Sequence, residues 1–547
     1  MLALIVACLL AQIAFAIPLE ERHVSLEERQ AGVGYAPRVA TCPTSSLVRP
    51  ASGLSSSESD YRSKRISKAN TALATWLKKT DKNFTTGTLP SVGLTVSGGG
   101  YRSLLEGAGL IQGLDSRDSS LSTSGLYQAL TYQAGLSGGG WLLTSVAGNN
   151  YPTISSLRDG LWEQAFQNSL LLPNNLLAAD AYTQITADIA AKNVAGFDPT
   201  LVDPYGRLLS YQLLLGDDGG VSKTMSGIKT YSNFTSFNAP YPIIAALGVK
   251  TFQNECLPGP NATQYEFHPY ESGSWDNGVS AFTNTMYLGT SYSNGKPAGP
   301  CYINYDNSGY VAGTTSNLFN ELCGVIPPVN STTDLPEALE ALIDSVTDGA
   351  PATRDLYATY KNPFQNYARS TLVSDESELD LVDGGEALQN NPIWPFIQTT
   401  KRTDVLIVND NSADTSNNFP NGSEILTTYV QAQSAGLTRM PAIPSVETFI
   451  ARGYDKRATF FGCDDASKLT IIYLPNVNYT YPSNQPTSKL QYSVAETNGM
   501  ITNGNSIATQ NGAADWPTCL GCAIMQKTGT KLPSQCTACF TKYCYKP

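Results

Sequence analysis

The sequence predicts an α/β fold, because apolar runs of strand length alternate with stretches of helical composition. Residues 91–97 (SVGLTVS) have the apolar character of a buried strand, and a stretch rich in small residues follows at about 102–114. A second apolar run at about 126–133 precedes a helix-compatible stretch through 141–146. Two successive strand–helix pairs in the first third of the chain therefore carry the prediction.

The rest of the chain continues this pattern less regularly. Further strands are expected at 404–408 (DVLIV) and 468–474 (KLTIIYL). Residues 215–320 are rich in Gly, Asn, Ser and aromatic residues, which favours long surface excursions over another sheet. Because no internal repeat or Pro/Gly linker is present, we expect one large domain over residues 41–547, with a cysteine-rich tail at 515–547.

Composition excludes several classes of protein. The chain has 547 residues, of which 41% are apolar and 15% charged, so it can build a large core and is not disordered as a whole. Its 35 Lys and Arg face 46 Asp and Glu, a formal net charge of −11. Nucleic-acid binders need basic surface, so no nucleic-acid partner is expected.

The amino terminus indicates export. Residues 2–11 (LALIVACLLA) are apolar and are followed by Ala14-Phe15-Ala16, a small-x-small cleavage pattern. The run is shorter than the ~20 residues of a membrane span, so we predict a signal peptide at 1–16. Residues 17–40 are expected to form a propeptide or flexible lead-in.

Localisation follows from the remaining segments. No later segment is long and apolar enough to span a bilayer, and the carboxyl end (TKYCYKP) lacks the hydrophobic tail of a GPI signal. The protein is therefore expected to be secreted and freely soluble.

Cysteine usage fits an oxidising compartment. Eleven cysteines become ten when Cys8 leaves with the signal peptide, and an even number suits a disulfide framework. The candidates are Cys42, Cys256, Cys301, Cys323, Cys463, Cys519, Cys522, Cys536, Cys539 and Cys544. The paired C-x-x-C motifs of the tail have zinc-ribbon-like spacing. The compartment and the nearby fifth thiol of Cys544 favour disulfides, whose pairing the sequence leaves open.

Six Asn-x-Ser/Thr sequons permit N-glycosylation without establishing secretion, since a chain this rich in Asn, Ser and Thr contains about that many by chance. They lie at Asn83, Asn233, Asn261, Asn330, Asn421 and Asn478.

A candidate nucleophile lies in residues 135–139 (GLSGG), which match G-x-S-x-G. This motif places a serine, here Ser137, on a tight strand-to-helix turn with its hydroxyl at the mouth of the sheet. A plain glycine-rich turn is the alternative. The apolar run before the motif and the helix-compatible run after it favour the nucleophile.

The histidine count argues against a Ser-His-Asp triad. The chain contains only His23 and His268. An α/β-hydrolase would place its histidine after the serine and the acid, yet none follows His268. His23 lies in the lead-in, and His268 lies in an aromatic, acidic stretch (QYEFHPYES) where a packed or loop position is expected.

A carboxylate remains as the candidate base. Asp383 ends a short apolar run and immediately precedes two glycines in residues 379–385 (LDLVDGG). That arrangement would present it at the carboxyl edge of a sheet, where α/β active sites collect; an ordinary Asp-Gly turn is the alternative. Because a carboxylate is a weak base, partial burial must raise its pKa or the serine must be unusually polarised.

A third motif, SGGGYR, follows the first predicted strand. The amides of Gly98, Gly99 and Gly100 can point at one spot and stabilise an oxyanion. Arg102 adds a positive charge suited to a phosphate headgroup. A nucleotide-phosphate loop is the alternative, but no G-x-x-x-x-G-K-[ST] pattern is present, and G-x-G-x-x-G fails because position 103 is Ser.

Together these stretches resemble the fungal secreted lysophospholipase (phospholipase B) family. The matching segments are 97–105 (SGGGYRSLL), 135–141 (GLSGGGW) and 379–395 (LDLVDGGEALQNNPIWP), with the tail DWPTCLGCAIMQ, CTACF and YC. The resemblance covers roughly residues 40–547. It implies a catalytic domain shared with animal cytosolic phospholipases and distantly like patatin: a central mixed sheet flanked by helices, with large loop insertions and a disulfide-rich tail.

The resemblance also implies roles for individual residues. Ser137 and Asp383 would form a Ser–Asp dyad, Gly99 and Gly100, with Gly98 as a further candidate, would donate to the oxyanion, and Arg102 would hold the headgroup phosphate. The implied reaction is hydrolysis of acyl esters of (lyso)glycerophospholipids through an acyl-enzyme.

The implied partners are phospholipid or lysophospholipid aggregates, and no cofactor or metal is expected; calcium dependence is not expected either, because no calcium-dependent lipid-binding domain precedes the catalytic region. The alternatives are a broader patatin-like lipid acyl hydrolase and a non-catalytic secreted glycoprotein or zinc-binding module.

Overall fold

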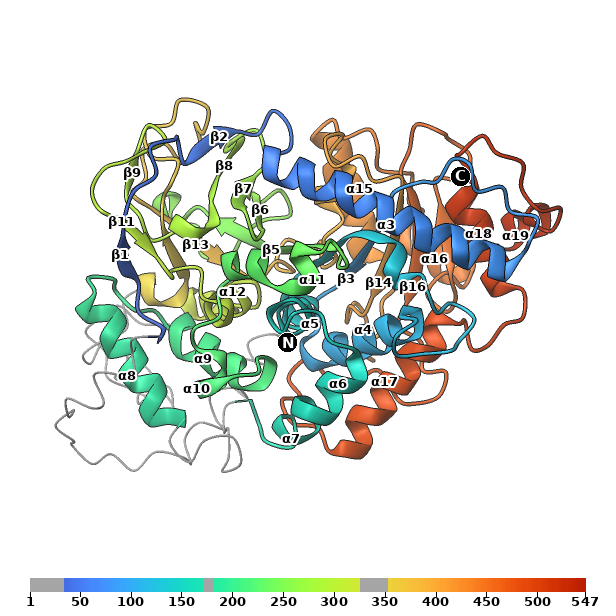
Figure 1. The fold of residues 1–547 in the computed structure, drawn as a ribbon, viewed down its shortest axis with the longest axis horizontal. Coiled ribbons are helices and arrows are strands. Elements are labelled where there is room, and N and C mark those ends of the chain that lie inside the picture. The colour runs from blue at the N-terminus through green and yellow to red at the C-terminus, as the bar shows by residue number, and fades with distance from the viewer. Residues whose placement is uncertain (1–33, 171–180, 325–352) are drawn as a thin grey trace.

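A computed structural model of the chain describes residues 34–170, 181–324 and 353–547 (Figure 1). The predicted signal peptide, most of the predicted lead-in and the sequon at Asn330 lie outside these residues. Within the described ranges, no helix combines the length and the apolar character that crossing a membrane requires.

The architecture is a mixed sheet flanked by helices, as predicted (Figure 1). The strands are β1 (Arg38–Ala40), β2 (Val48–Pro50), β3 (Val92–Val96), β4 (Leu130–Gly135), β5 (Tyr241–Val249), β6 (Gln264–Phe267), β7 (Glu271–Ser274), β8 (Ala281–Asn284), β9 (Tyr292–Ser293), β10 (Lys296–Pro297), β11 (Cys301–Ile303), β12 (Ala358–Lys361), β13 (Glu378–Val382), β14 (Val405–Asp410), β15 (Thr459–Phe461) and β16 (Thr470–Pro475). Twelve of them form one sheet in the order β15-β16-β14-β3-β4-β5-β6-β7-β8-β2, with β13 pairing with β5 and β12 with β13.

The α-helices lie on two sides of this sheet, with α3 and α18 above it and α4, α5 and α17 below it in Figure 1. They are α3 (Ser56–Thr80), α4 (Gly100–Leu114), α5 (Ser137–Gly148), α6 (Ile154–Leu157), α7 (Glu163–Ala165), α8 (Ala181–Val194), α9 (Val202–Leu213), α10 (Asp217–Gly220), α11 (Ser232–Thr235), α12 (Ser308–Thr314), α14 (Trp394–Ile397), α15 (Ser423–Ser434), α16 (Val446–Ala451), α17 (Val494–Ala508), α18 (Trp516–Met525) and α19 (Cys536–Tyr543).

The parallel centre of the sheet positions two of the predicted motifs. Strands β16, β14, β3, β4 and β5 run parallel to one another, and β3 and β4 are buried along their whole length, as continuous apolar strands in a covered sheet should be. Val96 pairs with Gly135 at the ends of β3 and β4. The glycine-rich turn after β3 and the G-x-S-x-G turn after β4 therefore leave the sheet side by side.

Helix α4 is buried on every side, which explains its small residues. All fifteen of its residues are buried, so it is a core helix rather than an amphipathic one. It crosses α17 closely: a side chain on Gly109 would lie 2.0 Å from the Ile501 carbonyl oxygen. Glycine at this position lets the two helix backbones approach, which a larger residue would prevent.

Residues 215–320 correct one expectation. Instead of surface excursions, this stretch supplies β5 to β8 of the main sheet, and β6 and β7 are fully buried. The polar composition is misleading because Glu266 in β6 and Glu271 in β7 are buried and paired with Lys401 and Arg49 from elsewhere in the chain, and His268 between the two strands is buried against Glu266.

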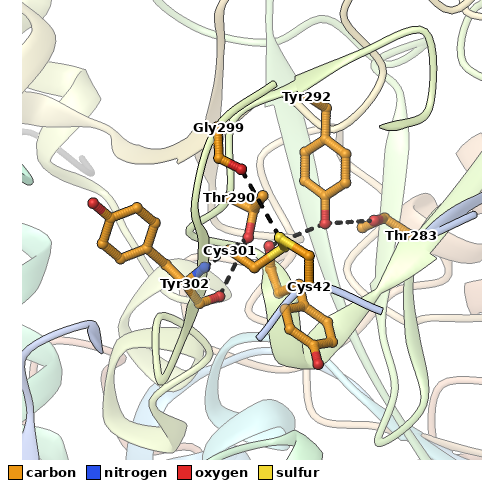
Figure 2. Close-up of a disulfide and its surroundings, with 8 residues drawn as sticks. Cys42, Thr283, Thr290, Tyr292, Gly299, Cys301 and Tyr302 are labelled. Atoms are coloured by element: carbon orange, nitrogen blue, oxygen red, sulfur yellow. Dashed lines mark hydrogen bonds between the residues drawn. A yellow bond between two sulfur atoms is a disulfide. The ribbon is translucent and has the colours of Figure 1, made fainter. Parts of the chain in front are cut away.

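The packed structure begins before residue 41. Tyr35 is buried and donates a 2.6 Å hydrogen bond to Asp203, and β1 pairs with β11 in an antiparallel ladder. A disulfide between Cys42 and Cys301 fastens the same ladder (Figure 2). Part of the predicted flexible lead-in is therefore held against the domain.

All ten candidate cysteines are paired, which confirms disulfides over zinc in the tail. The pairs are Cys42–Cys301, Cys256–Cys323, Cys463–Cys544, Cys519–Cys539 and Cys522–Cys536. The two C-x-x-C motifs pair with each other across α18 and α19, so the zinc-like spacing reflects two facing helix turns.

Candidate active site

Ser137 occupies the strand-to-helix turn that its motif predicts. It is the first residue of α5, two residues after β4 ends, and its φ of +50° is unusual for a residue with a side chain. Gly138 allows the turn to form, because a side chain there would lie 2.1 Å from the Gly100 carbonyl oxygen. The nucleophile turn and the glycine-rich turn are therefore in direct contact.

Asp383 faces this serine. The Ser137 hydroxyl donates a 2.8 Å hydrogen bond to Asp383 Oδ2, and the Gly385 amide donates a 2.7 Å bond to Oδ1. Burial raises the pKa of Asp383 from 3.8 to about 7, against the opposing effect of the two hydrogen bonds. A carboxylate with this pKa accepts a proton far more readily than an exposed aspartate does.

Sheet register explains how a residue so distant in sequence reaches the serine. β13 runs antiparallel to β5, and its last residue, Val382, pairs with Leu247. On the other side of β5, Gly135 at the end of β4 pairs with Ile244. β13 therefore runs antiparallel to β4, and it ends close to the end of β4, which brings Asp383 near Ser137.

Thr315 joins the loops that carry Ser137 and Asp383, a role that sequence reasoning missed. Its carbonyl oxygen accepts hydrogen bonds from the Ser137 amide at 2.9 Å and from the Gly384 amide at 3.2 Å. Its hydroxyl in turn donates to the Ala245 carbonyl in β5. The turn that carries Ser137 and the loop that carries Asp383 are thus both anchored to Thr315.

The three candidate oxyanion donors are not equivalent. The Gly98 amide donates a 2.9 Å hydrogen bond to the Asn390 carbonyl, so it is already engaged. Gly99 and Gly100 have φ values of +137° and +59°, and no acceptor within the described residues bonds their amides. These two amides begin α4, where the helix itself supplies no acceptor, and they are the better candidates.

Gly138 is a further candidate donor that the sequence prediction left out. Its amide follows the nucleophile, the position that commonly contributes to an oxyanion hole in G-x-S-x-G turns. A side chain on Gly138 would lie 2.7 Å from the Gly100 nitrogen, so the two glycines are adjacent. The G-x-S-x-G motif in the sequence could have identified Gly138 as a donor.

Arg102 is deeply buried and mostly engaged with backbone. Only 1% of its surface is exposed. Its Nε donates to the Asn411 carbonyl at 2.9 Å, and Nη1 donates to the Gln485 carbonyl at 2.7 Å. Nη2 has no partner among the described residues and lies beside Gly99. Burial lowers its pKa to about 10, so the guanidinium stays charged at neutral pH.

Asn390 closes the site from the other side. Its backbone amide donates to Glu424 Oε2 at 2.9 Å, and its side-chain Nδ2 donates to the Ser412 hydroxyl at 3.0 Å. Side chains added to Gly98 or Gly385 would lie 2.2 and 2.5 Å from Asn390 Oδ1. It falls within the segment 379–395 that carried the family resemblance, but that resemblance assigned it no role.

The site is nearly enclosed. Only 7% of the surface of Ser137 and 5% of that of Asp383 are exposed. A cavity of about 560 Å³ lies along β13 and the loop after β5; its lining includes Phe252, Cys256 and Tyr357 but neither Ser137 nor Asp383. The two side chains are therefore almost wholly shielded from solvent, and this cavity does not reach them.

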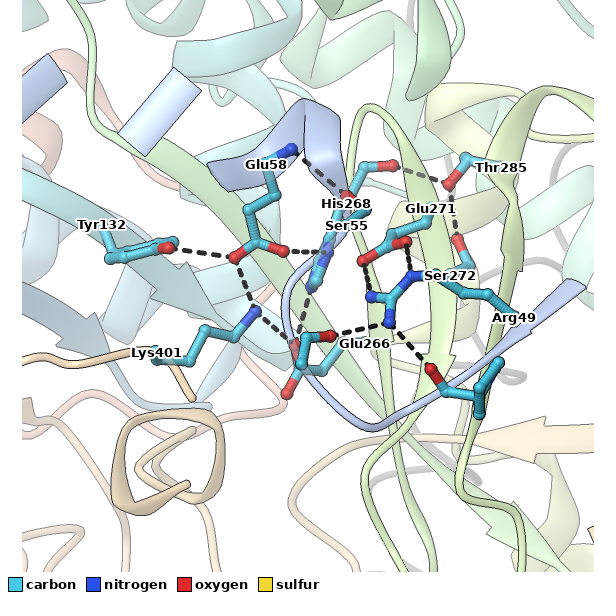
Figure 3. A network of polar contacts seen from close by, with 12 residues as sticks. Arg49, Ser55, Glu58, Tyr132, Glu266, His268, Glu271, Ser272, Thr285 and Lys401 are labelled. Atoms are coloured by element: carbon cyan, nitrogen blue, oxygen red, sulfur yellow. Dashed lines mark hydrogen bonds and ion pairs between the residues drawn. The ribbon is translucent and has the colours of Figure 1, made fainter. Parts of the chain in front are cut away.

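His268 lies in a different, buried cluster of charged groups (Figure 3). Its Nε2 is 2.7 Å from Glu266, and Lys401 contacts both Glu266 and Glu58 at 3.1 and 3.0 Å. Arg49 pairs with Glu271 through both carboxylate oxygens. The histidine is packed, as the sequence predicted, and its partners are structural rather than the serine.

The same cluster contains the group of side chains best placed to hold a metal among the described residues. Ligand atoms of Glu58, His268 and Glu271 all lie within 4.8 Å of one another. Lys401 already balances the charge of Glu58, and Arg49 balances that of Glu271. These side chains supply the positive charge that a metal would otherwise bring.

Known proteins are similar to this chain over nearly its whole length. A family model for the lysophospholipase catalytic domain matches residues 92–547. The chain is 36% identical to "Lysophospholipase 2" of Aspergillus fumigatus over 94% of its own length and 93% of that protein. It is also 36% identical to "Lysophospholipase 1" of Saccharomyces cerevisiae, over 93% of this chain and 83% of that one.

Solved structures share the fold. The human GIVD cytosolic phospholipase A2 superimposes with a TM-score of 0.68 at 17% identity, covering 89% of this chain and 69% of that one. The same enzyme in complex with methyl γ-linolenyl fluorophosphonate gives a TM-score of 0.62, also at 17% identity, over 89% of this chain and 67% of that one.

Proposed function

The chain belongs to the lysophospholipase family and is thus a carboxylic ester hydrolase, and from this premise we propose that it releases fatty acids from (lyso)glycerophospholipids through a Ser–Asp dyad. The observation that carries the proposal is the 2.8 Å hydrogen bond from Ser137 Oγ to a buried Asp383 carboxylate. This pair supplies a nucleophile and a base without a histidine.

In the acylation step, Asp383 accepts the Ser137 proton as Oγ attacks the ester carbonyl carbon. The amides of Gly99 and Gly100, with Gly138, hold the negative charge that develops on the carbonyl oxygen. The tetrahedral intermediate then collapses, the glycerophospho-alcohol leaves with the proton from Asp383, and the acyl group remains on Ser137.

Deacylation repeats the chemistry with water. Asp383 takes a proton from the attacking water, the same amides hold the second oxyanion, and the fatty acid leaves as Ser137 recovers its proton from Asp383. Over one turnover the original Ser137 proton leaves with the glycerophospho-alcohol and a proton from water replaces it, so Ser137 and Asp383 return to their starting protonation states.

Arg102 is proposed to assist the phosphate end of the substrate. Its Nη2 carries the only guanidinium hydrogens without a partner among the described residues, and it lies beside Gly99. Its other nitrogens are bound to backbone carbonyls and so fix its position. A fixed charge next to the oxyanion donors would favour anionic phosphate headgroups over neutral esters.

We also propose that the protein is secreted and glycosylated. Its five disulfides suit an oxidising compartment. Among the sequons, Asn83, Asn261 and Asn478 are exposed and could accept a glycan without disturbing the fold. Mass analysis of protein from the culture medium, before and after deglycosylation, tests both points.

The reaction is tested by fatty-acid release from lysophosphatidylcholine and from diacyl phosphatidylcholine, with a chelator present. Ser137→Ala is compared with wild type and with Ser434→Ala, which changes an exposed serine at the end of α15. Release by wild type and Ser434→Ala, but not by Ser137→Ala, is expected. Equal release by all three would refute the dyad.

The two substrates divide the remaining possibilities. Release from the lyso substrate alone defines a lysophospholipase, and release from both defines a phospholipase B. Faster release from galactolipids or neutral esters than from either phospholipid would point to a broader lipid acyl hydrolase. Labelling of Ser137 by a fluorophosphonate would separate any of these enzymes from a non-catalytic glycoprotein.

A further inference from the structure

Two exposed leucines lie on loops next to the catalytic carboxylate. Leu388 is 56% exposed and Leu257 is 53% exposed, although both are large apolar side chains. Leu388 belongs to the segment that begins at Asp383 and ends at Asn390, beside the glycine-rich turn. An apolar side chain is therefore presented to solvent between two parts of the active site.

The two loops are joined on both sides of the leucines. Asn320 Nδ2 donates to Glu386 Oε2 at 2.7 Å and to the Cys256 carbonyl at 3.3 Å. Gln389 Nε2 donates to the Pro260 carbonyl at 2.8 Å. On its loop, Leu388 lies between Glu386 and Gln389, which make these contacts. On the other loop, Leu257 lies between their partners, Cys256 and Pro260.

Burial of apolar surface does not explain the position of either leucine. Leu388 has a φ of +56°, a left-handed conformation that is unfavourable for a bulky residue, and its side chain gains no burial in return. Leu257 follows the Cys256–Cys323 disulfide and precedes Pro258 and Pro260, which stiffen its loop. Both side chains are thus exposed on loops that the hydrogen bonds of Asn320 and Gln389 hold together.

We propose that Leu257 and Leu388 form an apolar patch that inserts into the surface of a neutral phospholipid aggregate and seats the Ser137–Asp383 site against it. This inference rests on the proposed function, because the substrate must be drawn from such an aggregate. Apolar side chains at the rim of a lipid-hydrolysing site gain free energy only when they leave water.

The charge of the protein favours a neutral lipid surface. Near the patch, Glu255 is paired with Lys250 at 3.8 Å. Burial raises the pKa of Glu321 to about 7 and that of Glu386 well above its ordinary value, so these two carboxyl groups add little charge at neutral pH, and the charge of the whole chain decides. The formal charge of the whole chain is −11. An anionic surface would be repelled, whereas a zwitterionic surface with outward ammonium groups would not.

The test uses the full-length enzyme, deglycosylated because the exposed Asn261 borders the patch. Leu257→Gln, Leu388→Gln and the double variant keep side-chain size while removing apolar surface. Leu121→Gln is the matched control: it changes an exposed leucine in the turn beyond the carboxyl end of α4, about 20 Å along that helix from the active site.

Binding to phosphatidylcholine vesicles is measured by sedimentation, and hydrolysis is measured on a short-chain lysophosphatidylcholine below its micelle concentration. We expect each patch variant to bind vesicles about tenfold more weakly, and the double variant about 100-fold more weakly, because a leucine returned to water loses at least that factor. Hydrolysis of the monomeric substrate should stay within about twofold.

Three results would overturn the patch: unchanged vesicle binding by the double variant, an equal loss of binding in Leu121→Gln, or an equal loss of activity on the monomeric substrate. Tighter wild-type binding to phosphatidylglycerol than to phosphatidylcholine vesicles would overturn the choice of a neutral surface. Leucine-dependent vesicle binding without any wild-type hydrolysis would uphold the patch and refute the proposed reaction.

Discussion

Replacing Asp383 with asparagine is expected to abolish turnover and, at the same time, to make the folded protein more stable at neutral pH. The carboxyl group has a pKa of about 7 in the folded protein, because burial raises it from 3.8. The folded state therefore holds this proton more tightly than the unfolded chain does. Deprotonation of Asp383, which its proposed role as a base requires, therefore lowers the free energy of unfolding.

The pH dependence follows from this difference. Below 3.8 the carboxyl group is protonated in both states and contributes nothing. As the pH rises from 3.8 to about 7, only the unfolded chain releases its proton, so the free energy of unfolding falls; above about 7 the loss is constant. The interval corresponds to roughly 4 kcal/mol at about 1.4 kcal/mol for each pH unit.

Asparagine removes that penalty while keeping the shape of the protonated acid. Its oxygen can accept the Gly385 amide and its NH₂ group can donate to Ser137. We expect the variant to unfold about 4 °C above wild type at pH 8, since a chain of this length has an unfolding entropy near 1 kcal/mol per degree. At pH 4 the two proteins should unfold at nearly the same temperature.

Scanning calorimetry at both pH values measures this difference. Ser137→Ala is the matched control, because it is equally inactive, retains the carboxyl group and loses its hydrogen bond; it should not gain stability at pH 8. Equal unfolding temperatures for wild type and Asp383→Asn at pH 8, or a shift of the same size at pH 4, would refute the reasoning.

Three other predictions concern activity. The kcat/KM for lysophosphatidylcholine should rise with pH through a midpoint near the pKa of about 7 of Asp383, and full activity at pH 4 would contradict it as the base. Gly99→Ala should lower kcat by about 10²–10³-fold, because its φ is +137° and its Cβ would lie 2.5 Å from Arg102 Nη2; Gly436→Ala, at a φ of +70° with open space around it, is the control that should keep kcat. His268→Ala should retain kcat but lose about 2–5 kcal/mol of stability, because it leaves a cavity in the buried cluster and removes the contact with Glu266, and a folded but inactive variant would restore the triad.

The sequence predicted the parts of the fold whose chemistry is local. β3, β4, β14 and β16 are buried along their whole length and consist mostly of apolar residues, so their composition alone identified them. The strands β6 and β7 (QYEF and ESGS) escaped prediction because they are buried yet polar. Their burial depends on partners such as Lys401, which lies far away in sequence and which no local pattern could connect to them.

In the candidate site too, the sequence predicted only the residues whose local motif determines their structure. Ser137 and Asp383 stand in motifs whose residues determine their own turns, and the structure places them in contact. Thr315 and Asn390 contact the site through backbone and side-chain atoms whose partners come from distant parts of the chain, so no local pattern identified them. Gly98 was a reasonable donor by sequence, but its amide is taken by a carbonyl that only the tertiary structure brings near.

The buried charge cluster around His268 makes distant parts of the chain depend on one another during assembly. Its acids and bases come from β2, α3, β6, β7 and the segment after α14, and Lys401, Glu58 and His268 are fully buried. An intermediate that lacks any of these segments would hold a charge away from water without its counterpart. Partly folded forms are thus disfavoured, and a chain cut between β7 and α14 should yield two fragments that become native only together.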